Sequence, residues 1–317
     1  MTCHKRTKQS VLVIAFLVII TYEIHRVVSA ITMRPATPSR TVAINEVSGI
    51  IFSKVDILHG PTAFAHKTYA TLAKLIQKDY INPPSGVPFD RSTLSKDEKG
   101  EANQAQIVDE LLGGLRNGFF IESGAADGLY HSNTLFLETQ RNWTGILIEP
   151  NPSQFQVLQK AKRNCHSLQG CLSVHNYAEE VTFLNAGHVG GIKGVNVPRS
   201  ISQQRTWSNY RRISFESRVQ CFPLYSILLA LGNPRVDLLS LDVEGAELEI
   251  LQTIPWDKVD IGVILVEVDP WSKHAIHNIL ALHGYVFIRS IRGQDRLFQK
   301  RRPGVSHQKL FTMFDEA

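Results

Sequence analysis

From about Phe119 to Ile291, short apolar runs alternate with segments whose apolar residues recur every three or four positions. The short runs have the length and composition of buried strands, and the other segments have the period of amphipathic helices. Regular alternation of the two is typical of βαβ units around a parallel sheet. The expected strands are Phe119–Glu122, Gly145–Glu149, Gln169–Val174, Val236–Asp242 and Ile261–Val268. The expected helices are Ser132–Gln140, Ser153–Lys162, Leu224–Leu231, Ala246–Leu251 and Ser272–Leu282.

Two further apolar runs follow the last of these helices. Tyr285–Ile291 and Arg296–Gln299 are separated by the turn-forming residues Arg292-Gly293-Gln294-Asp295, which predicts an antiparallel hairpin at one edge of the sheet. The stretch Gly187–Arg218 is rich in Gly, Ser and Arg, and is interpreted as a loop-rich insertion over one face. We therefore expect a Rossmann-like α/β domain over residues 117–300, mostly parallel, with a C-terminal antiparallel hairpin.

A second region of helical spacing precedes this domain. Apolar positions recur at helical intervals from Thr62 to Asp79, and again from Ile107 to Leu112, where Gly113-Gly114 ends the pattern. Residues 61–116 are therefore interpreted as a helical extension. Residues 32–60 show no sustained period and are interpreted as a stem, and residues 301–317 as a C-terminal tail.

The N-terminus begins with a basic stretch, followed by an apolar run from Val11 to Tyr22. We interpret residues 10–31 as a membrane helix that acts as a signal-anchor, although Val28-Ser29-Ala30 also fits the cleavage site of a signal peptide. In either case the basic charges keep residues 1–9 in the cytoplasm and send the domain into the lumen. The expected location is the secretory pathway, in the endoplasmic reticulum, the Golgi or an endosome.

Composition and charge narrow the class of protein. Apolar residues make up 43% of the 317 residues, which suits a folded core, and the formal net charge is +5. Neither of the two small basic clusters is interleaved with stacking aromatics, so we expect no nucleic-acid partner. Behind the membrane segment, Cys165, Cys171 and Cys221 would lie in an oxidising compartment. Three thiols permit one bridge and one buried free thiol, with the pairing left open, and no Cys/His spacing predicts a zinc site.

The candidate chemistry lies where the strands end, because ligands of open α/β sheets bind outside the carboxyl ends of the strands. The first strand ends in the turn Glu122-Ser123-Gly124-Ala125-Ala126-Asp127-Gly128. Glycine lets the backbone pass close to a ligand, and free amides at the next helix can hold a carboxylate. Beyond the turn, Ser132 is a natural helix N-cap and Asn133 is placed to contact a ligand. The turn is thus a candidate binding loop, although such turns often serve packing alone.

Carboxylates also end three other strands. Glu149 follows an apolar strand about 20 residues after the glycine turn, where an acidic side chain accepts both hydroxyls of a ribose. Asp242, Glu244 and Glu267 follow neighbouring strands, where clustered carboxylates can form a general base. Glu244 and Glu247 could instead only favour a helix N-terminus electrostatically. Such a cluster could also hold a hard divalent cation, but we assign no metal to it.

Together these residues resemble the FkbM-type methyltransferase domain, and more closely the Star family of membrane-anchored insect proteins that carry such a domain. The resemblance covers about Gln104 to Phe298, and it extends to the short basic tail and single N-terminal membrane segment. It rests on the segments Asn117–Gly128, Ser132–Thr134, Gly145–Pro152, Cys171–Ser173 and Leu241–Glu247.

The resemblance implies the Rossmann-like fold of the class I S-adenosylmethionine-dependent methyltransferases, with S-adenosylmethionine as cofactor. The residues that it places at the cofactor are Glu122, Gly124, Asp127 and Gly128 along the methionine part, Glu149 at the ribose, and Leu172 with Ser173 on the adenine side. Asn133 completes this expected set. Asp242, Glu244 and Glu267 would lie beside the methyl donor and are the expected catalytic residues.

Two functions follow from the resemblance. FkbM-type enzymes methylate hydroxyl groups of sugars and related metabolites, which would make this chain a lumenal O-methyltransferase that acts on a glycan or metabolite. Star-like members are instead associated with moving epidermal-growth-factor-receptor ligands from the endoplasmic reticulum to the Golgi. The chain would then be a non-catalytic trafficking regulator with an EGF-like cargo, and fold alone does not choose between the two.

Overall fold

The computed structural model describes residues 45–47, 50–52, 58, 66–87, 102–186, 189–195 and 215–301. The predicted cytoplasmic tail, membrane segment and C-terminal tail lie outside these residues, apart from Arg301. Within the described ranges, no helix combines the length and apolar character needed to cross a membrane. In the predicted stem, β1 (Asn45–Val47) and β2 (Ile50–Phe52) form an antiparallel pair.

An eight-stranded sheet organises the domain, in the order β13-β14-β12-β11-β4-β5-β6-β3. Its five central strands are parallel: β6 (His166–Gln169), β5 (Thr144–Glu149), β4 (Phe119–Ser123), β11 (Val236–Leu241) and β12 (Ile261–Glu267). The chain runs outward from β4 to β6 and then returns to the other side of β4 at β11. The strand order therefore reverses between β4 and β11, and this is the point where α/β sheets open a crevice for ligands.

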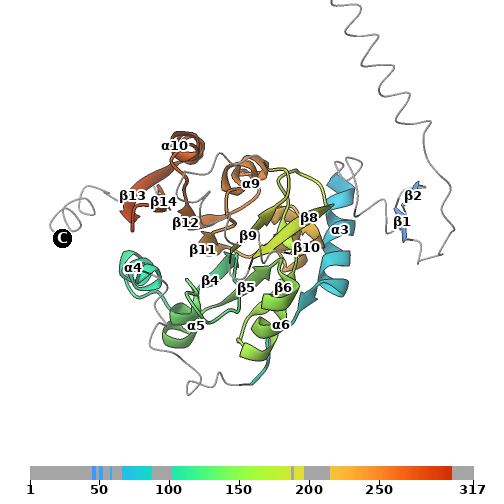
Figure 1. Ribbon diagram of the computed structural model, residues 1–317, viewed down its shortest axis with the longest axis horizontal. Helices are drawn as coiled ribbons and strands as arrows, with labels where there is room; N and C mark the ends of the chain where they lie inside the picture. The colour runs from blue at the N-terminus through green and yellow to red at the C-terminus, as the bar shows by residue number, and fades with distance from the viewer. Residues whose placement is uncertain are drawn as a thin grey trace, which may run out of the picture. The chain divides into compact units, whose positions relative to one another are not determined.

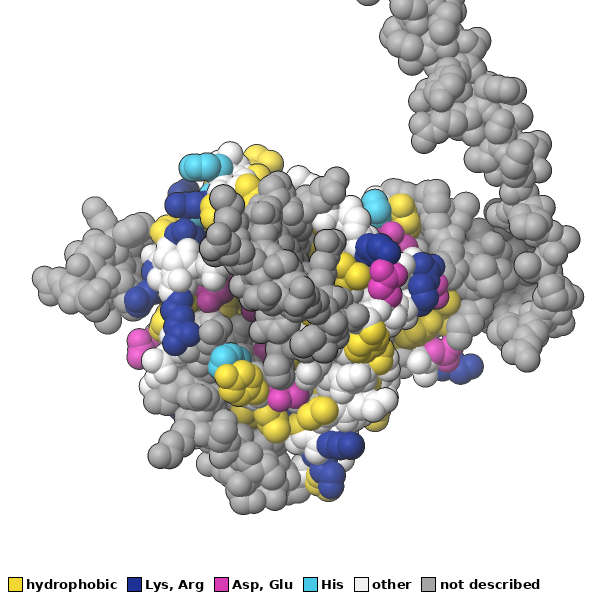
Figure 2. All heavy atoms as spheres, in the orientation of Figure 1, with side chains coloured by type: hydrophobic (Ala, Val, Ile, Leu, Met, Phe, Trp, Pro, Cys, Tyr) yellow, Lys and Arg dark blue, Asp and Glu magenta, His cyan; other side chains and the backbone are white. Residues whose placement is uncertain are grey.

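Antiparallel strands close both edges of this sheet. β13 (Tyr285–Ile291) and β14 (Asp295–Lys300) form the predicted hairpin, and β14 pairs with β12. At the opposite edge β3 (Ile81–Asn82) pairs with β6. Figure 2 shows Lys and Arg side chains gathered where α10 and the hairpin lie. Charged side chains at the edge of a sheet oppose its pairing with a strand of another chain. The prediction of a mostly parallel sheet with a C-terminal antiparallel hairpin is confirmed.

Helices cover both faces of the sheet, and Figure 1 shows α5 and α6 on one side with α9 and α10 on the other. Packed with one face are α3 (His66–Asp79), α8 (Leu224–Ala230), α9 (Glu247–Thr253) and α10 (Lys273–Leu282). Packed with the other are α4 (Gln104–Leu111), α5 (Leu135–Arg141) and α6 (Pro152–Ala161). In β5, Ile146 and Ile148 enter the first core while Leu147 enters the second. Burial on both faces explains why these strands are continuous apolar runs.

A second sheet, in the order β7-β10-β8-β9, was not expected from the hydrophobic pattern. Its strands are β7 (Cys171–Leu172), β10 (Phe215–Phe222), β8 (Glu179–Ala186) and β9 (Val189–Ile192). The interpretation of Gly187–Arg218 as loop was therefore wrong at both ends, because β9 and the start of β10 fall within it. These strands contain Gly, Glu and Arg, so their apolar period is weak.

The predicted strand Gln169–Val174 was also wrong, because the chain changes sheets at Gly170. Gln169 ends β6 in the large sheet, whereas Cys171 begins β7 in the small one. The N–H of Gly170 donates to the carbonyl of Glu149 at 3.1 Å, and a Cβ at Gly170 would lie 2.6 Å from the carbonyl oxygen of Gln220. Glycine is therefore needed where the two sheets approach each other.

The three cysteines within the described residues form one bridge and leave one free thiol, as expected. Cys171 of β7 and Cys221 of β10 are register partners, joined by a disulfide across Cα atoms 4.3 Å apart. Cys165 is buried and free, and packs in the core on the side of α6.

Candidate functional site

Two adjoining clefts open over the carboxyl ends of β4 and β11, at the point where the strand order reverses. They share Ser123, Gly124, Asp242 and Glu244. The first cleft runs from the shared residues toward the four-stranded sheet. Its further lining residues include Glu149, Asn151, Cys171, Leu172, Phe183, Ile192 and Ile250. The second cleft runs toward α4 and the loop before α5, and its further lining residues include Gln104, Glu122, Tyr130, His131, Asn133 and Ser240.

Gly124 allows the end of β4 to touch the end of β11. Its φ is +88°, and an ideal Cβ built on it would lie 1.8 Å from the carbonyl oxygen of Asp242. The Gly124 N–H donates to the carbonyl of Ile148 in β5 at 3.1 Å. Only glycine fits this conformation and this contact, so the residue fixes the shared floor of both clefts.

Glu149 ties the glycine turn to the start of α6. Its Oε2 accepts a hydrogen bond from the Ala126 N–H and its Oε1 accepts one from the Asn151 N–H, both at 2.7 Å. Asn151 in turn caps α6 by accepting from the Ser153 N–H at 3.0 Å. Burial raises the pKa of Glu149 to about 8, against the opposing effect of the two backbone donors. The carboxyl group lies at the first cleft with lone pairs left for a ligand.

Four carboxyl groups gather beyond β11 and β12. Burial, followed by the charges of Asp242, Glu244 and Glu247, raises the pKa of Glu267 far above its usual range. Glu267 therefore keeps its proton and shares a hydrogen bond with Asp242. Glu244 has a φ of +62°, an unusual conformation for a residue other than glycine. The structure thus brings together the three predicted catalytic residues and adds Glu247 to them.

Glu247 holds the turn between β11 and α9. Its Oε1 accepts hydrogen bonds from the N–H groups of Val243 at 2.9 Å and Gly245 at 3.1 Å. Burial raises the pKa of Glu247 to about 7. This side chain therefore shapes the loop that carries Asp242 and Glu244 into the clefts.

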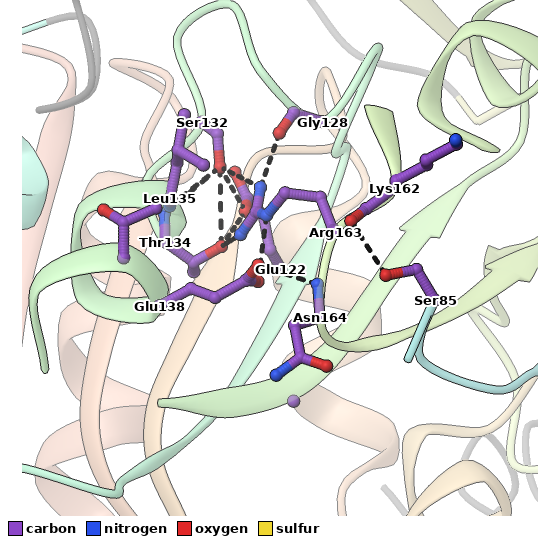
Figure 3. A network of polar contacts seen from close by, with 12 residues as sticks. Ser85, Glu122, Gly128, Ser132, Thr134, Leu135, Glu138, Lys162, Arg163 and Asn164 are labelled. Carbon is purple, nitrogen blue, oxygen red and sulfur yellow. Dashed lines mark hydrogen bonds and ion pairs between the residues drawn. The ribbon is translucent and has the colours of Figure 1, made fainter. Parts of the chain in front are cut away.

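The Glu122 carboxylate is occupied by hydrogen bonds from its own chain. It accepts from Ser132 Oγ at 2.9 Å, from the Asn133 N–H at 2.8 Å and from Thr134 Oγ1 (Figure 3). The predicted helix Ser132–Gln140 begins only at Leu135, and Ser132 Oγ accepts from the Leu135 N–H at 3.2 Å. Glu122 therefore fixes the loop that carries Asn133 into the second cleft.

Arg163 supplies the positive charge of this network (Figure 3). Its Nε lies 2.9 Å from Glu138 Oε2, and its other nitrogens donate to Ser132 Oγ, Thr134 Oγ1 and the carbonyl of Gly128. Burial raises the pKa of Glu122, and the charge of Arg163 opposes that rise. Arg163, Glu122 and Glu138 are all buried, so the network is a charged part of the protein interior.

Three predicted cofactor residues lie outside the linings of both clefts. Asp127 Oδ1 accepts from the N–H groups of Leu129 at 2.9 Å and Tyr130 at 2.8 Å, which closes the turn after β4. Gly128 packs next to Leu158, and Ser173 Oγ donates to Glu179 Oε1 at 2.6 Å. The predicted residues that do line a cleft are Glu122, Gly124, Asn133, Glu149, Leu172, Asp242 and Glu244.

Several cleft residues were missed by sequence reasoning. Phe183 and Ile192 come from strands that the apolar pattern did not reveal, and no local signal marks them. Tyr130 and His131 stack with ring centroids 3.7 Å apart at the second cleft. These two follow the glycine turn directly, so their position beside a predicted binding loop could have indicated them.

The family is decided by a match over most of this domain. A model of the methyltransferase FkbM domain matches residues 122–287, which is more than half of the 317-residue chain. The chain belongs to the FkbM methyltransferase family. No curated protein matches the chain.

Solved structures that resemble this FkbM-family chain are remote. Methyltransferase FkbM from Methylobacillus flagellatus KT is 13% identical with a TM-score of 0.35, over 69% of this chain and 48% of that one. Precorrin-6y C5,15-methyltransferase from Geobacter metallireducens is 11% identical with a TM-score of 0.35, over 69% of this chain and 100% of that one. The human methyltransferase 10 domain containing protein is 12% identical with a TM-score of 0.34, over 73% of this chain and 95% of that one.

Family membership supports S-adenosylmethionine as the cofactor, and the residues present fit it. Glu149 offers carboxylate oxygens for ribose hydroxyls, and Leu172 and Phe183 offer an apolar wall for a base. Asn133 is only 8% exposed, its Nδ2 donates to Ser240 Oγ at 3.1 Å, and its Oδ1 is buried with no hydrogen-bond partner among the described residues. That oxygen can accept from the ammonium of a methionine moiety. No group of His, Cys, Asp or Glu among the described residues is arranged to hold a metal ion.

Proposed function

We propose that this FkbM-family protein is an S-adenosylmethionine-dependent O-methyltransferase that acts on a hydroxyl group of a glycan or metabolite. The observation that carries the proposal is the junction of the two clefts at Asp242 and Glu244. One cleft has the carboxylate and apolar wall suited to an adenosine, and the other leads from the same carboxylates to Tyr130 and His131. A cofactor with its adenosine in the first cleft and its methionine end at Asn133 in the second would have its methyl group near this junction, so an acceptor that reaches the junction would meet it beside a carboxylate.

The side chains at this junction suit deprotonation of a hydroxyl. S-adenosylmethionine, when bound, supplies an electrophilic methyl group. Asp242 lines both clefts and accepts the proton of the attacking hydroxyl. Glu267 remains protonated and hydrogen-bonds to Asp242, which orients that carboxylate. We assign Asp242 as the base, Glu267 as the residue that positions it, and Glu244 as a second carboxylate at the acceptor.

Calorimetric titration of the purified full-length chain with S-adenosylmethionine tests the cofactor site. Glu149→Gln should weaken binding roughly ten- to a hundredfold, because hydrogen bonds to a charged group contribute about 1.5–3 kcal/mol. Since burial raises the pKa of Glu149 to about 8, the carboxyl is protonated at pH 6 and ionised at pH 9. The affinity of the wild type for S-adenosylmethionine should therefore rise between pH 6 and pH 9. Glu149→Gln has no carboxyl group at this position and should not show this part of the rise.

Glu216→Gln is the matched control for this titration, because Glu216 is exposed and pairs only with Lys193 among its described neighbours. It should bind the cofactor like the wild type. Absence of binding at millimolar cofactor, or equal affinity for Glu149→Gln and wild type at every pH, would contradict the proposed site.

We further propose that the enzyme acts in the lumen of the secretory pathway, attached through residues 10–31. The basic stretch before the apolar run supports this orientation. The Cys171–Cys221 disulfide also supports it, because such bonds persist in oxidising compartments and are rare in the cytosol.

The Star resemblance supports a second candidate, in which the same domain binds EGF-like cargo and regulates its transport without catalysis. A double variant, Asp242→Ala with Glu149→Ala, separates the candidates in cells that secrete an epidermal-growth-factor-receptor ligand. If the domain only binds cargo, a folded double variant should export the ligand normally, since only the carboxyl groups of the proposed site have been removed. Loss of export with the chain still folded would contradict a purely scaffolding role.

A further inference from the structure

The four-stranded sheet forms one wall of the first cleft. Leu172 of β7, Phe183 of β8 and Ile192 of β9 line the cleft from this sheet. The sheet has only a small core of its own, in which Cys171, Phe183, Val219 and Cys221 are buried together. Leu172 of β7 and Phe222 of β10 pack in the larger core instead, so the small core needs further bonds to hold β7 against β10.

The disulfide joins the cleft lining directly to this small core. Cys171 lines the cleft and Cys221, its register partner in β10, is fully buried. Because β7 is only two residues long, the sheet ladder contributes few bonds there. One backbone hydrogen bond lies on each side of β7. The Gly170 N–H donates to the Glu149 carbonyl at 3.1 Å, and the Ser173 N–H donates to the Phe222 carbonyl at 2.9 Å.

These contacts place the disulfide between the residues that would hold the two halves of an adenosine. Gly170 connects β7 to Glu149, which faces the ribose in the proposed function, and Leu172 follows Cys171 at the apolar wall. A movement of β7 away from β10 would therefore displace Leu172 within the larger core, whereas β4 and β11 are also held by their own ladder of hydrogen bonds and by the second core. Loss of the disulfide should therefore disturb the wall of the first cleft and leave the large sheet folded.

We propose that the Cys171–Cys221 disulfide is a positioning element of the cofactor cleft, and that its reduction weakens cofactor binding without unfolding the domain. This inference rests on the proposed function. In the reaction a dithiol reductant gives two electrons and two protons, the Sγ–Sγ bond breaks, Cys171 and Cys221 become thiols, and the reductant closes to its own disulfide.

The test uses the full-length chain and calorimetry with S-adenosylmethionine before and after treatment with dithiothreitol, a dithiol. The dissociation constant should rise at least about tenfold on reduction, a change of about 1.4 kcal/mol. Removal of the dithiol and reoxidation should restore the original value. Alkylation and mass spectrometry would confirm the state of each cysteine.

Variants distinguish the local effect from a general one. Cys171→Ala with Cys221→Ala should bind weakly and be insensitive to dithiothreitol, with hydrogen exchange increased in β7 and β10 and unchanged in β4 and β11. Cys165→Ala is the matched control, because Cys165 is a buried free thiol in the other core, and it should respond to reduction like the wild type.

An unchanged dissociation constant after complete reduction overturns the inference, while binding by the oxidised chain leaves the proposed function standing. Increased exchange throughout β4 and β11 also overturns it, since the bridge would then be a general stabiliser. If the oxidised wild-type chain binds no S-adenosylmethionine, the proposed function fails and takes this inference with it.

Discussion

Gly124→Ala should abolish cofactor binding and lower the free energy of unfolding by about 3 kcal/mol or more. The added Cβ would lie 1.8 Å from the carbonyl oxygen of Asp242, at a φ of +88° that side chains rarely adopt. Relief of that overlap requires β4 and β11 to move apart at the floor shared by both clefts. Urea denaturation would measure the stability, and calorimetry with S-adenosylmethionine the binding.

Gly232→Ala is the matched control for this substitution. Gly232 has a φ of +86°, yet a Cβ there would meet nothing within 4 Å. The control therefore carries the left-handed backbone penalty alone, about 1–2 kcal/mol, and should bind the cofactor normally. If the two variants were equally stable, the close approach of Gly124 to Asp242 would not be a constraint on the fold.

Arg163→Met should destabilise the protein by about 3–5 kcal/mol, because it leaves the buried carboxylates of Glu122 and Glu138 without their cation. The loss should be measured by urea denaturation at pH 8. Arg218→Met is the control: Arg218 pairs with Glu180 at 2.6 Å, but its side chain is 63% exposed. Such a surface pair contributes about 0–1 kcal/mol.

The cost of Arg163→Met should also depend on pH. Burial already raises the pKa of Glu122, and removal of Arg163 takes away the charge that opposes the rise. A carboxyl whose pKa is raised in the folded state contributes stability below its unfolded pKa, and this contribution is lost as the pH rises. The deficit of the variant should therefore be smaller at pH 5 than at pH 8. A deficit that is independent of pH would show that lost packing, not charge, is responsible.

The large sheet could be predicted because its strands are buried on both faces. Phe119–Glu122 and Ile261–Val268 are continuous apolar runs, and the structure has β4 and β12 there within a residue. The parallel order, the hairpin and the strand ends follow from that pattern. The carboxylates Glu149, Asp242 and Glu267 could be placed for the same reason, since each follows such a run.

The small sheet and the details of the site depend on contacts that no local pattern encodes. Phe183 and Ile192 reach the first cleft because β9 pairs with its neighbour β8, and β8 pairs in turn with β10 further along the chain. The hydrogen bonds of Glu122 come from Ser132, Asn133 and Thr134, and the charge that opposes its rise in pKa comes from Arg163, which follows α6. The position of Glu122 at a strand end therefore did not indicate that its carboxylate accepts hydrogen bonds from its own chain. Asp127 likewise closes its own turn.

The packing of α3 has a consequence for how the chain is made. Leu72 and Ile76 of α3 are almost fully buried and share a core with Leu224 and Ile227 of α8, which follows much later in the sequence. At a synthesis rate of about 5–20 residues per second, α3 leaves the ribosome on the order of ten seconds before its partner. During that interval the surface that α8 provides is missing, so part of the apolar stripe of α3 is left uncovered. The nascent chain should therefore depend on chaperones that bind early and release it once α8 has emerged.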